Sequence, residues 1–120
     1  MRVTIYHNPR CGKSRQTLQL LKEQGIDPVI VEYLKTPPSA EVLETILQKL
    51  GLNPRELMRT KEAEFKTLGL ADPSLDRAAL IDAMVNHPIL IERPIVVTDH
   101  QAAVGRPPEA VLALNLVAEQ

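Results

Sequence analysis

The sequence has little sulfur and few aromatic rings: one Cys, two Tyr, one Phe and no Trp occur among its 120 residues. A single cysteine cannot close an internal disulfide, which excludes a disulfide scaffold and a cysteine-built zinc site and is consistent with a reducing compartment. So few rings leave little surface on which nucleic-acid bases can stack. Because 14 basic residues are balanced by 15 acidic ones, the overall charge also argues against a nucleic-acid partner.

Long apolar runs are missing as well. No stretch approaches the ~18 residues that a membrane-spanning helix requires, and the opening residues MRVTIYHNP lack the apolar core of a signal peptide. We therefore expect no membrane partner and a cytoplasmic location. With 120 residues, of which 44% are hydrophobic, the chain can bury one core, which predicts a single domain over residues 1–120. We also expect a monomer.

The first third of the chain predicts a strand, a helix and a second strand. Apolar patterns and turn residues place these segments at 3–6, 14–24 and 27–34. Strands joined through a helix in this way pair in parallel. The only cysteine, Cys11, is then expected at the first turn of the helix or just before it.

The middle of the chain, about 39–87, is predicted to be a helical block. Its apolar residues recur at helical spacing, and three of its helices are expected to begin after the capping residues Ser39, Asn53 and Asp76. The last part predicts a strand begun by Pro94, where a cis bond is possible, and a brief strand within 100–104. A turn at Gly105 and a helix begun by two prolines complete a small α/β sandwich.

The cysteine stands where the first strand turns into the first helix, in the segment NPRCGKSR. A lone Cys is often buried filler, but a residue in a Pro-Arg-Cys-Gly turn lies near the surface. There a thiolate would meet the unpaired N–H groups and the positive dipole end of the helix, with Lys13 and Arg15 adding cationic charge. These surroundings lower a thiol pKa from its usual ~8.5, so we interpret Cys11 as a reactive nucleophile.

Two look-alike motifs are excluded. The GKS at 12–14 resembles the end of a phosphate-binding P-loop, but that pattern needs a glycine where this chain has His7. A cysteine-based phosphatase loop would close on an arginine at the position of Thr17. What remains is Cys-x-x-Ser, with Ser14 where thioredoxin-like proteins carry a second cysteine. The thiol that resolves Cys11 must therefore come from another molecule.

The neighbours of Cys11 have several candidate roles. His7 titrates near neutrality and, from the preceding turn, could assist ionisation of Cys11, or it could be a turn histidine with no proton role. Asn8 is expected to hydrogen-bond within the turn. Ser14 could cap the helix or contact the thiolate, and we favour capping. His87 and His100 show no metal-ligand spacing, so no metal site is expected.

The chain as a whole resembles the glutaredoxin-coupled arsenate reductase family, which is related to the Spx proteins. The resemblance is carried by YHNPRCGKSR, LMR, HPILIERPIVV and GRPPE, in order from residue 3 to about 115. It implies an α/β, thioredoxin-like mixed sheet with a central helical insertion at about 39–87. It also implies that Cys11 attacks arsenate, that Arg59, Arg93 and Arg106 hold the oxyanion, and that a cis proline, Pro94, faces the cysteine.

The residue types suit such a substrate. Planar guanidinium groups offer paired N–H donors to the oxygens of a tetrahedral dianion better than lysine does. Arg93 and Arg106 both precede a proline, which restricts their backbone as a presented ligand requires. Arg59 rests mainly on the resemblance, whereas Arg55 and Arg77 are interpreted as solvated surface charges.

Three hypotheses follow. In the first, Cys11 reduces arsenate to arsenite with glutathione as co-substrate, glutaredoxin as partner and no tightly bound cofactor, in a role in arsenic resistance. In the second, a glutathione-dependent thiol reductase of the same fold acts on another substrate, because Arg10 and Lys13 flank the nucleophile where better-known members carry smaller residues. In the third, the chain is an Spx-like redox regulator of transcription, against which Ser14 replaces the second cysteine of the usual switch.

Overall fold

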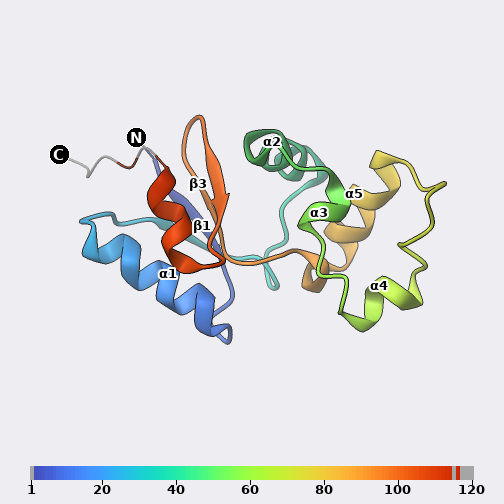
Figure 1. Cartoon of the computed structure of the whole chain (residues 1–120), viewed down its shortest axis with the longest axis horizontal. Helices are drawn as coiled ribbons and strands as arrows, with labels where there is room; N and C mark the ends of the chain where they lie inside the picture. Colours follow the sequence, from blue (N-terminus) through green and yellow to red (C-terminus); the bar gives the residue numbers. More distant parts are fainter. Residues whose placement is uncertain (1, 115, 117–120) are drawn as a thin grey trace. The chain divides into compact units, whose positions relative to one another are not determined.

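The computed structural model describes residues 2–114 and 116, and its chain divides into two compact units (Figure 1). The first unit combines Met1–Thr36 with Arg93–Gln120, and the second, Pro37–Glu92, interrupts it in the sequence. The helical block expected at about 39–87 falls within the second unit. The expectation of a single domain stays a prediction.

The first unit is built on a four-stranded mixed sheet. The strands lie in the order β2-β1-β3-β4, with bounds Val29–Glu32, Thr4–His7, Ile95–Val97 and Ala102–Val104. β1 pairs in parallel with β2, as predicted for a strand, helix, strand unit, and antiparallel with β3, which itself pairs antiparallel with β4. In this register Ile5 lies between Ile30 and Val96. This pairing brings residues near 5 and 95 together.

Two helical segments pack against one another and against this sheet: α1 (Gly12–Glu23, blue in Figure 1) and the 3₁₀ segment η2 (Pro108–Ala113, red). The core they form consists of Val3, Ile5, Leu21, Ile26, Val96, Val111 and Leu114. Each such side chain stabilises the fold by about 1.5–3 kcal/mol when it is fully removed from water. Burial of this one apolar cluster therefore fixes α1 over the central strands.

Several boundaries in the first unit differ from the sequence prediction. α1 begins at Gly12 rather than Ser14, because Cys11 already occupies the N-cap position. The last helical segment is 3₁₀ rather than α over 108–113, and the part of the predicted helix at 115 and 117–120 lies outside the described residues. Two consecutive prolines fit this tight opening turn, since proline lacks the N–H that a helix start leaves unpaired.

The second unit is helical. Its elements are α2 (Ala40–Leu50), α3 (Pro54–Leu57), α4 (Ala63–Thr67), α5 (Arg77–Asn86) and the 3₁₀ turn η1 (Pro88–Leu90). The predicted caps are present: Ser39 Oγ accepts from the Val42 N–H at 3.2 Å, and Asp76 Oδ1 accepts from the Ala79 N–H at 2.8 Å. α2 ends at Gly51, whose φ of 68° is the left-handed conformation that glycine adopts without strain.

The apolar stripes of α2 and α5 form the core of this unit, with buried side chains Leu43, Ile46, Leu47, Leu80, Ile81 and Met84. Beyond α3 the chain is held to the segment after η1 by backbone hydrogen bonds. Arg59 N–H donates to the Leu90 carbonyl at 2.7 Å, and Glu92 N–H donates to the Leu57 carbonyl at 2.9 Å. These two backbone hydrogen bonds place Arg59 beside Glu92, although the two residues are far apart in the sequence.

Candidate active site

Cys11 is the N-cap residue of α1, as its place in the sequence predicts. Its N–H donates to the Asn8 carbonyl at 3.0 Å, and its own carbonyl accepts from the Arg15 N–H at 3.0 Å. The first bond closes the turn after β1, and the second begins the helix. The thiol is half-buried and free, so it faces the first-turn amides while a small molecule can still reach it.

The pKa of Cys11 is lowered from the usual 9.0 of a thiol. Burial of the sulfur acts in the opposite direction, but the backbone N–H of Ser14, the guanidinium of Arg93 and the backbone N–H of Lys13 together outweigh it. Donors and positive charge favour the thiolate over the neutral thiol. The thiolate is the nucleophilic form of cysteine, so this environment activates Cys11.

Two of the three predicted arginines lie at this sulfur. Arg93 hydrogen-bonds to the thiolate, and Arg106 Nη1 lies 4.0 Å from Cys11 Sγ and donates to the Arg93 carbonyl at 3.2 Å. The Arg93-Pro94 peptide bond is cis, as expected, and the Arg106-Pro107 bond is cis as well. The helix end and these two guanidinium groups form a compact cationic site around one nucleophile.

A close packing contact at Gly105 brings the Arg106 segment to α1. A Cβ placed on Gly105 would lie 2.5 Å from Thr17 Oγ1 and 2.8 Å from Pro94 Cγ, closer than side-chain atoms pack. The Gly105 N–H donates to the Pro94 carbonyl at 2.9 Å, and the Thr17 hydroxyl donates to the Lys13 carbonyl at 2.8 Å. The sequence predicted a turn at Gly105 but not this contact; its only signal is a glycine directly before Arg-Pro-Pro.

The prediction that Ser14 caps α1 is wrong. Ser14 lies fully buried inside the first turn, where its Oγ accepts from the Asn8 N–H at 3.0 Å and hydrogen-bonds to His7 Nδ1 at 2.6 Å. Because α1 begins two residues earlier than expected, the Ser14 side chain projects back toward the end of β1 instead of across the helix terminus. Ser14 thus ties the turn to the strand before it.

His7 is the last residue of β1 rather than part of the turn. It is buried, with 6% of its surface exposed. Burial lowers its pKa from the usual 6.5; Glu32 opposes this change, and Arg15 and Lys22 add to it. The lowered pKa favours the neutral form of His7, and His7 is hydrogen-bonded to Ser14, whose backbone N–H helps to lower the pKa of Cys11. A proton role for His7 stays a prediction.

The supporting residues Asn8 and Arg15 shape the turn. Asn8 Oδ1 accepts from the Arg10 N–H at 3.0 Å, which is the local hydrogen bond expected for Asn in a turn. Arg15 Nη1 donates to the Pro9 carbonyl at 2.9 Å. Arg15 thus holds the turn that contains Cys11, and its positive charge helps to lower the pKa of His7.

Arg59 belongs to the second unit, where two carboxylates hold its side chain. Its Nε lies 3.0 Å from Glu62 Oε1 and its Nη1 lies 2.9 Å from Glu92 Oε1. Burial acts to lower its pKa, but Glu62 and Glu92 outweigh burial and raise it. A role for Arg59 in holding the oxyanion stays a prediction.

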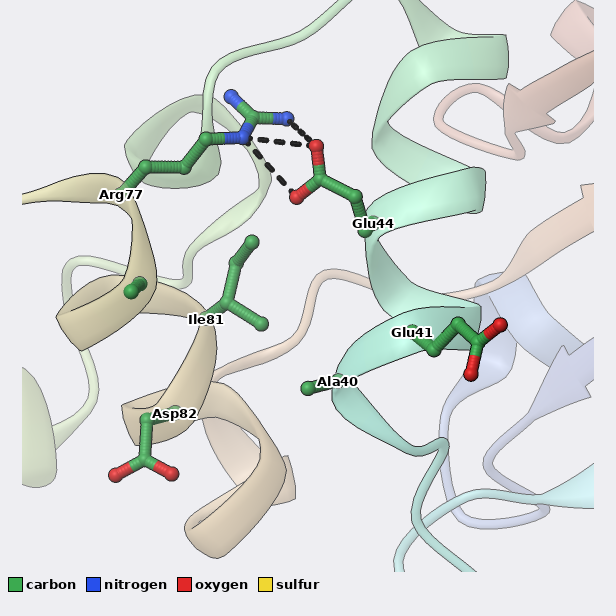
Figure 2. Close-up of a pocket in the computed structure, with 7 residues that line it drawn as sticks. Ala40, Glu41, Glu44, Arg77, Ile81 and Asp82 are labelled. Carbon is green, nitrogen blue, oxygen red and sulfur yellow. Dashed lines mark hydrogen bonds and ion pairs between the residues drawn. The ribbon is translucent and has the colours of Figure 1, made fainter.

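A cavity of about 530 Å³ lies between α2 and α5 in the helical unit (Figure 2). Arg77 on α5 and Glu44 on α2 form an ion pair across it, with Nη2 to Oε1 at 2.9 Å. Arg77 is exposed, as interpreted from the sequence, and in addition its charge is paired with Glu44 on the facing helix. Arg55 also has partners, since its guanidinium donates to the carbonyls of Leu70 and Asp72.

The described residues show neither a cluster of metal-binding side chains nor a membrane-spanning helix. Over residues 2–114 and 116, no group of three or more His, Cys, Asp or Glu is placed to hold a metal ion. Within the same part of the chain, every helix is too short or too polar to cross a bilayer.

Comparison with known proteins identifies the family. The sequence model of the ArsC family matches residues 6–114. A curated relative, the uncharacterized protein YfgD of Escherichia coli strain K12, is 58% identical over 93% of this chain and 95% of its own. The arsenate reductase of Rhizobium meliloti strain 1021 is 51% identical, over 93% and 80% respectively. The chain belongs to the ArsC family.

A solved structure agrees with this assignment. The arsenate reductase from Vibrio cholerae is 56% identical and superposes with a TM-score of 0.92, covering 94% of this chain and 97% of that one. The α/β, thioredoxin-like mixed sheet expected from the sequence is thereby confirmed. The helices of the second unit lie between β2 and β3 in the sequence, where the helical insertion was expected.

Proposed function

We propose that this protein is an arsenate reductase that uses Cys11 as its only catalytic thiol, with glutathione and glutaredoxin as reductants. The observation that carries the proposal is the arrangement at Cys11: a thiol of lowered pKa, with Arg93 hydrogen-bonded to it and Arg106 Nη1 at 4.0 Å. Arsenate is a tetrahedral anion that guanidinium groups bind through paired hydrogen bonds. Relatives named arsenate reductase, at 44–51% identity, support the same reaction.

In the first step, the Cys11 thiolate attacks the arsenic of bound arsenate. A sulfur–arsenic bond forms, and one arsenate oxygen leaves as water after protonation. Arg93 and Arg106 hold the remaining oxygens, whose negative charge would otherwise repel the thiolate. Arsenic is still in oxidation state five at this point.

In the second step, the thiolate of glutathione attacks the Cys11 sulfur. A disulfide forms between Cys11 and glutathione, and the electron pair of the sulfur–arsenic bond departs with arsenic, which leaves as arsenite in oxidation state three. A thiol from outside is required because the chain holds one cysteine and Ser14 cannot resolve it. Glutaredoxin then takes the glutathionyl group, and a second glutathione regenerates glutaredoxin as glutathione disulfide forms. No tightly bound cofactor enters this reaction sequence, and its use of glutathione as reductant suits a reducing cytoplasm.

A coupled assay tests the proposal. Purified protein, arsenate, glutathione, glutaredoxin and glutathione reductase should show arsenate-dependent oxidation of NADPH. Cys11→Ser should show none, and protein stalled without glutaredoxin should gain the mass of one glutathione. Sustained turnover with thioredoxin as the only reductant, or activity that survives Cys11→Ser, would contradict the mechanism.

One comparison favours a second candidate, a glutathione-dependent thiol reductase acting on another substrate. The chain is 58% identical to YfgD of E. coli strain K12 and 44% identical to the arsenate reductase of the same strain. It is therefore more similar to the protein whose name states no activity. Formation of the glutathione adduct at Cys11 with no reduction of arsenate would favour this candidate.

A further inference from the structure

A cavity of about 210 Å³ lies in the first unit beside the turn that presents Cys11. It is lined by His7, Asn8, Pro9 and Arg10 on one side and by Glu32, Leu34 and Lys35, at the end of β2 and just beyond it, on the other. The Cys11 N–H donates to the Asn8 carbonyl at 3.0 Å. One wall of the cavity and the nucleophile thus belong to the same hydrogen-bonded turn.

The cavity wall combines apolar surface with one pair of opposite charges. Leu34 is a large apolar side chain that remains 39% exposed here, and Pro9 adds more apolar surface. Lys35 Nζ lies 3.5 Å from Glu32 Oε1, and the two side chains are 79% and 43% exposed. Such an exposed ion pair is weak, so a ligand that brings its own ammonium and carboxylate can replace it.

The γ-glutamyl end of glutathione carries this combination. Its free α-carboxylate and α-ammonium group sit on one carbon, followed by two methylene groups. The carboxylate can pair with the Lys35 ammonium group, the ammonium group can pair with the Glu32 carboxylate, and the methylenes can pack on Leu34. Arg10, also on the wall, adds positive charge for a peptide with two carboxylates.

We propose that this cavity binds the γ-glutamyl end of the peptide thiol that resolves Cys11, with the Glu32–Lys35 pair recognising its amino-acid group. The inference rests on the proposed function and names the site of its co-substrate. A tripeptide spans roughly 10 Å when extended, and the cavity begins one residue before Cys11. A peptide held there can therefore bring its cysteine to the nucleophile, while Arg93 and Arg106 hold the oxyanion.

The first test measures binding without chemistry. S-methylglutathione cannot form a disulfide, so it is titrated into the full-length Cys11→Ser protein and followed by amide chemical shifts. We expect saturable shifts that centre on Arg10, Leu34 and Lys35. No saturable binding, or shifts that centre elsewhere, would overturn the assignment.

The second test determines which end of the peptide binds in the cavity. γ-Glutamylcysteine keeps the amino-acid group that we assign to the cavity, whereas cysteinylglycine lacks it. Their S-methyl derivatives should therefore differ, with the first binding nearly as well as S-methylglutathione and the second about tenfold more weakly. Equal binding of both derivatives would contradict the assignment.

The third test reverses one charge of the Glu32–Lys35 pair. Lys35→Glu should weaken S-methylglutathione about tenfold and leave the S-methyl derivative of cysteinylglycine unchanged. Lys66→Glu is the matched control, because Lys66 is an exposed lysine in the other unit; it should change neither. Equal losses for Lys35→Glu and Lys66→Glu would assign the effect to net charge and overturn the proposal.

These measurements use no arsenate, so the inference and the proposed function can fail separately. Binding at the cavity without arsenate reduction would keep the thiol site and reassign the oxyanion substrate. Arsenate reduction without binding at the cavity would keep the reductase and overturn the thiol site.

Discussion

Arg106 in the first unit and Arg59 in the second have different kinds of partner. Arg106 donates to the Arg93 carbonyl and approaches the Cys11 sulfur, whereas Arg59 lies between the carboxylates of Glu62 and Glu92. A carbonyl orients a guanidinium group without cancelling its charge, and a carboxylate does both.

The same contrast holds for other arginines. Near Cys11, Arg15 is held by the Pro9 carbonyl, while in the helical unit Arg77 is paired with Glu44. Arg15 and Arg106 in the first unit thus donate to backbone carbonyls, and Arg59 and Arg77 in the helical unit pair with carboxylates, although Arg55 of that unit also donates to carbonyls. The difference shows why counting arginines in the sequence does not locate an anion site.

The largest effect should come from the arginines at the sulfur. Arg93→Ala and Arg106→Ala should each lose about 1.5–3 kcal/mol of substrate binding or transition-state stabilisation, the range for hydrogen bonds to charged groups. The measurement is kcat/KM for arsenate in the coupled assay. Normal kinetics in both variants would place the oxyanion elsewhere and remove the contrast between the units.

Gly105→Ala should sharpen the comparison by displacing Arg106 without changing its charge. The added Cβ meets Thr17 Oγ1 and Pro94 Cγ, and overpacking of this kind destabilises a protein by about 1–3 kcal/mol. We expect a lower melting temperature, a raised KM for arsenate and a raised thiol pKa. The double variant Gly105→Ala/Thr17→Ala removes both Thr17 atoms near the added Cβ, Oγ1 at 2.5 Å and Cγ2 at 3.1 Å, and should recover part of each loss.

The ionisation of Cys11 gives a smaller effect that depends on pH. The rate of alkylation by iodoacetamide should show a midpoint below 9.0, and Arg93→Ala should move that midpoint upward, since Arg93 helps to lower the pKa. An unchanged midpoint in Arg93→Ala would mean that the helix end alone activates the thiol.

The lowered pKa of Cys11 also makes the free energy of unfolding depend on pH. A thiol whose pKa is lower in the folded state stabilises the fold fully above its unfolded pKa, and this contribution is lost as the pH falls through the folded value. Urea unfolding of wild type and Cys11→Ser should therefore give a difference in free energy that grows in favour of wild type as the pH rises toward 9.0. A difference that shrinks over this range would contradict the lowered pKa.

The smallest effect is expected at the ion pair of the helical unit. Arg77→Ala should lower the melting temperature slightly, because an exposed pair contributes little, and should leave kcat/KM unchanged. Glu44→Gln should match it in both measurements. A loss of activity in Arg77→Ala without a loss of stability would give the cavity of Figure 2 a role in the reaction.

Several features of this structure could be predicted from short segments of the sequence. The N-caps Ser39 and Asp76 and the position of Cys11 at a helix start follow from short segments of chain, whereas the cis bond before Pro94 was implied by the family resemblance. Each depends on hydrogen bonds or backbone restrictions that span a few residues. The wrong assignment of Ser14 arose within the same range, because a shift of two residues in the helix start moves a side chain from the cap into the first turn.

Other features needed the tertiary structure. Arg106 and Cys11 are 95 residues apart in sequence, and they meet through the pairing of β1 with β3 and β3 with β4. The close approach of Gly105 to Thr17 and the pairing of Arg77 with Glu44 depend on the same kind of packing between distant segments. The sequence by itself determined a strand, a turn and a helix with a thiol at its start, since period and capping are local. Which charges reach that thiol was decided by the fold, because the hydrogen-bond register and side-chain packing bring together residues that no local pattern relates.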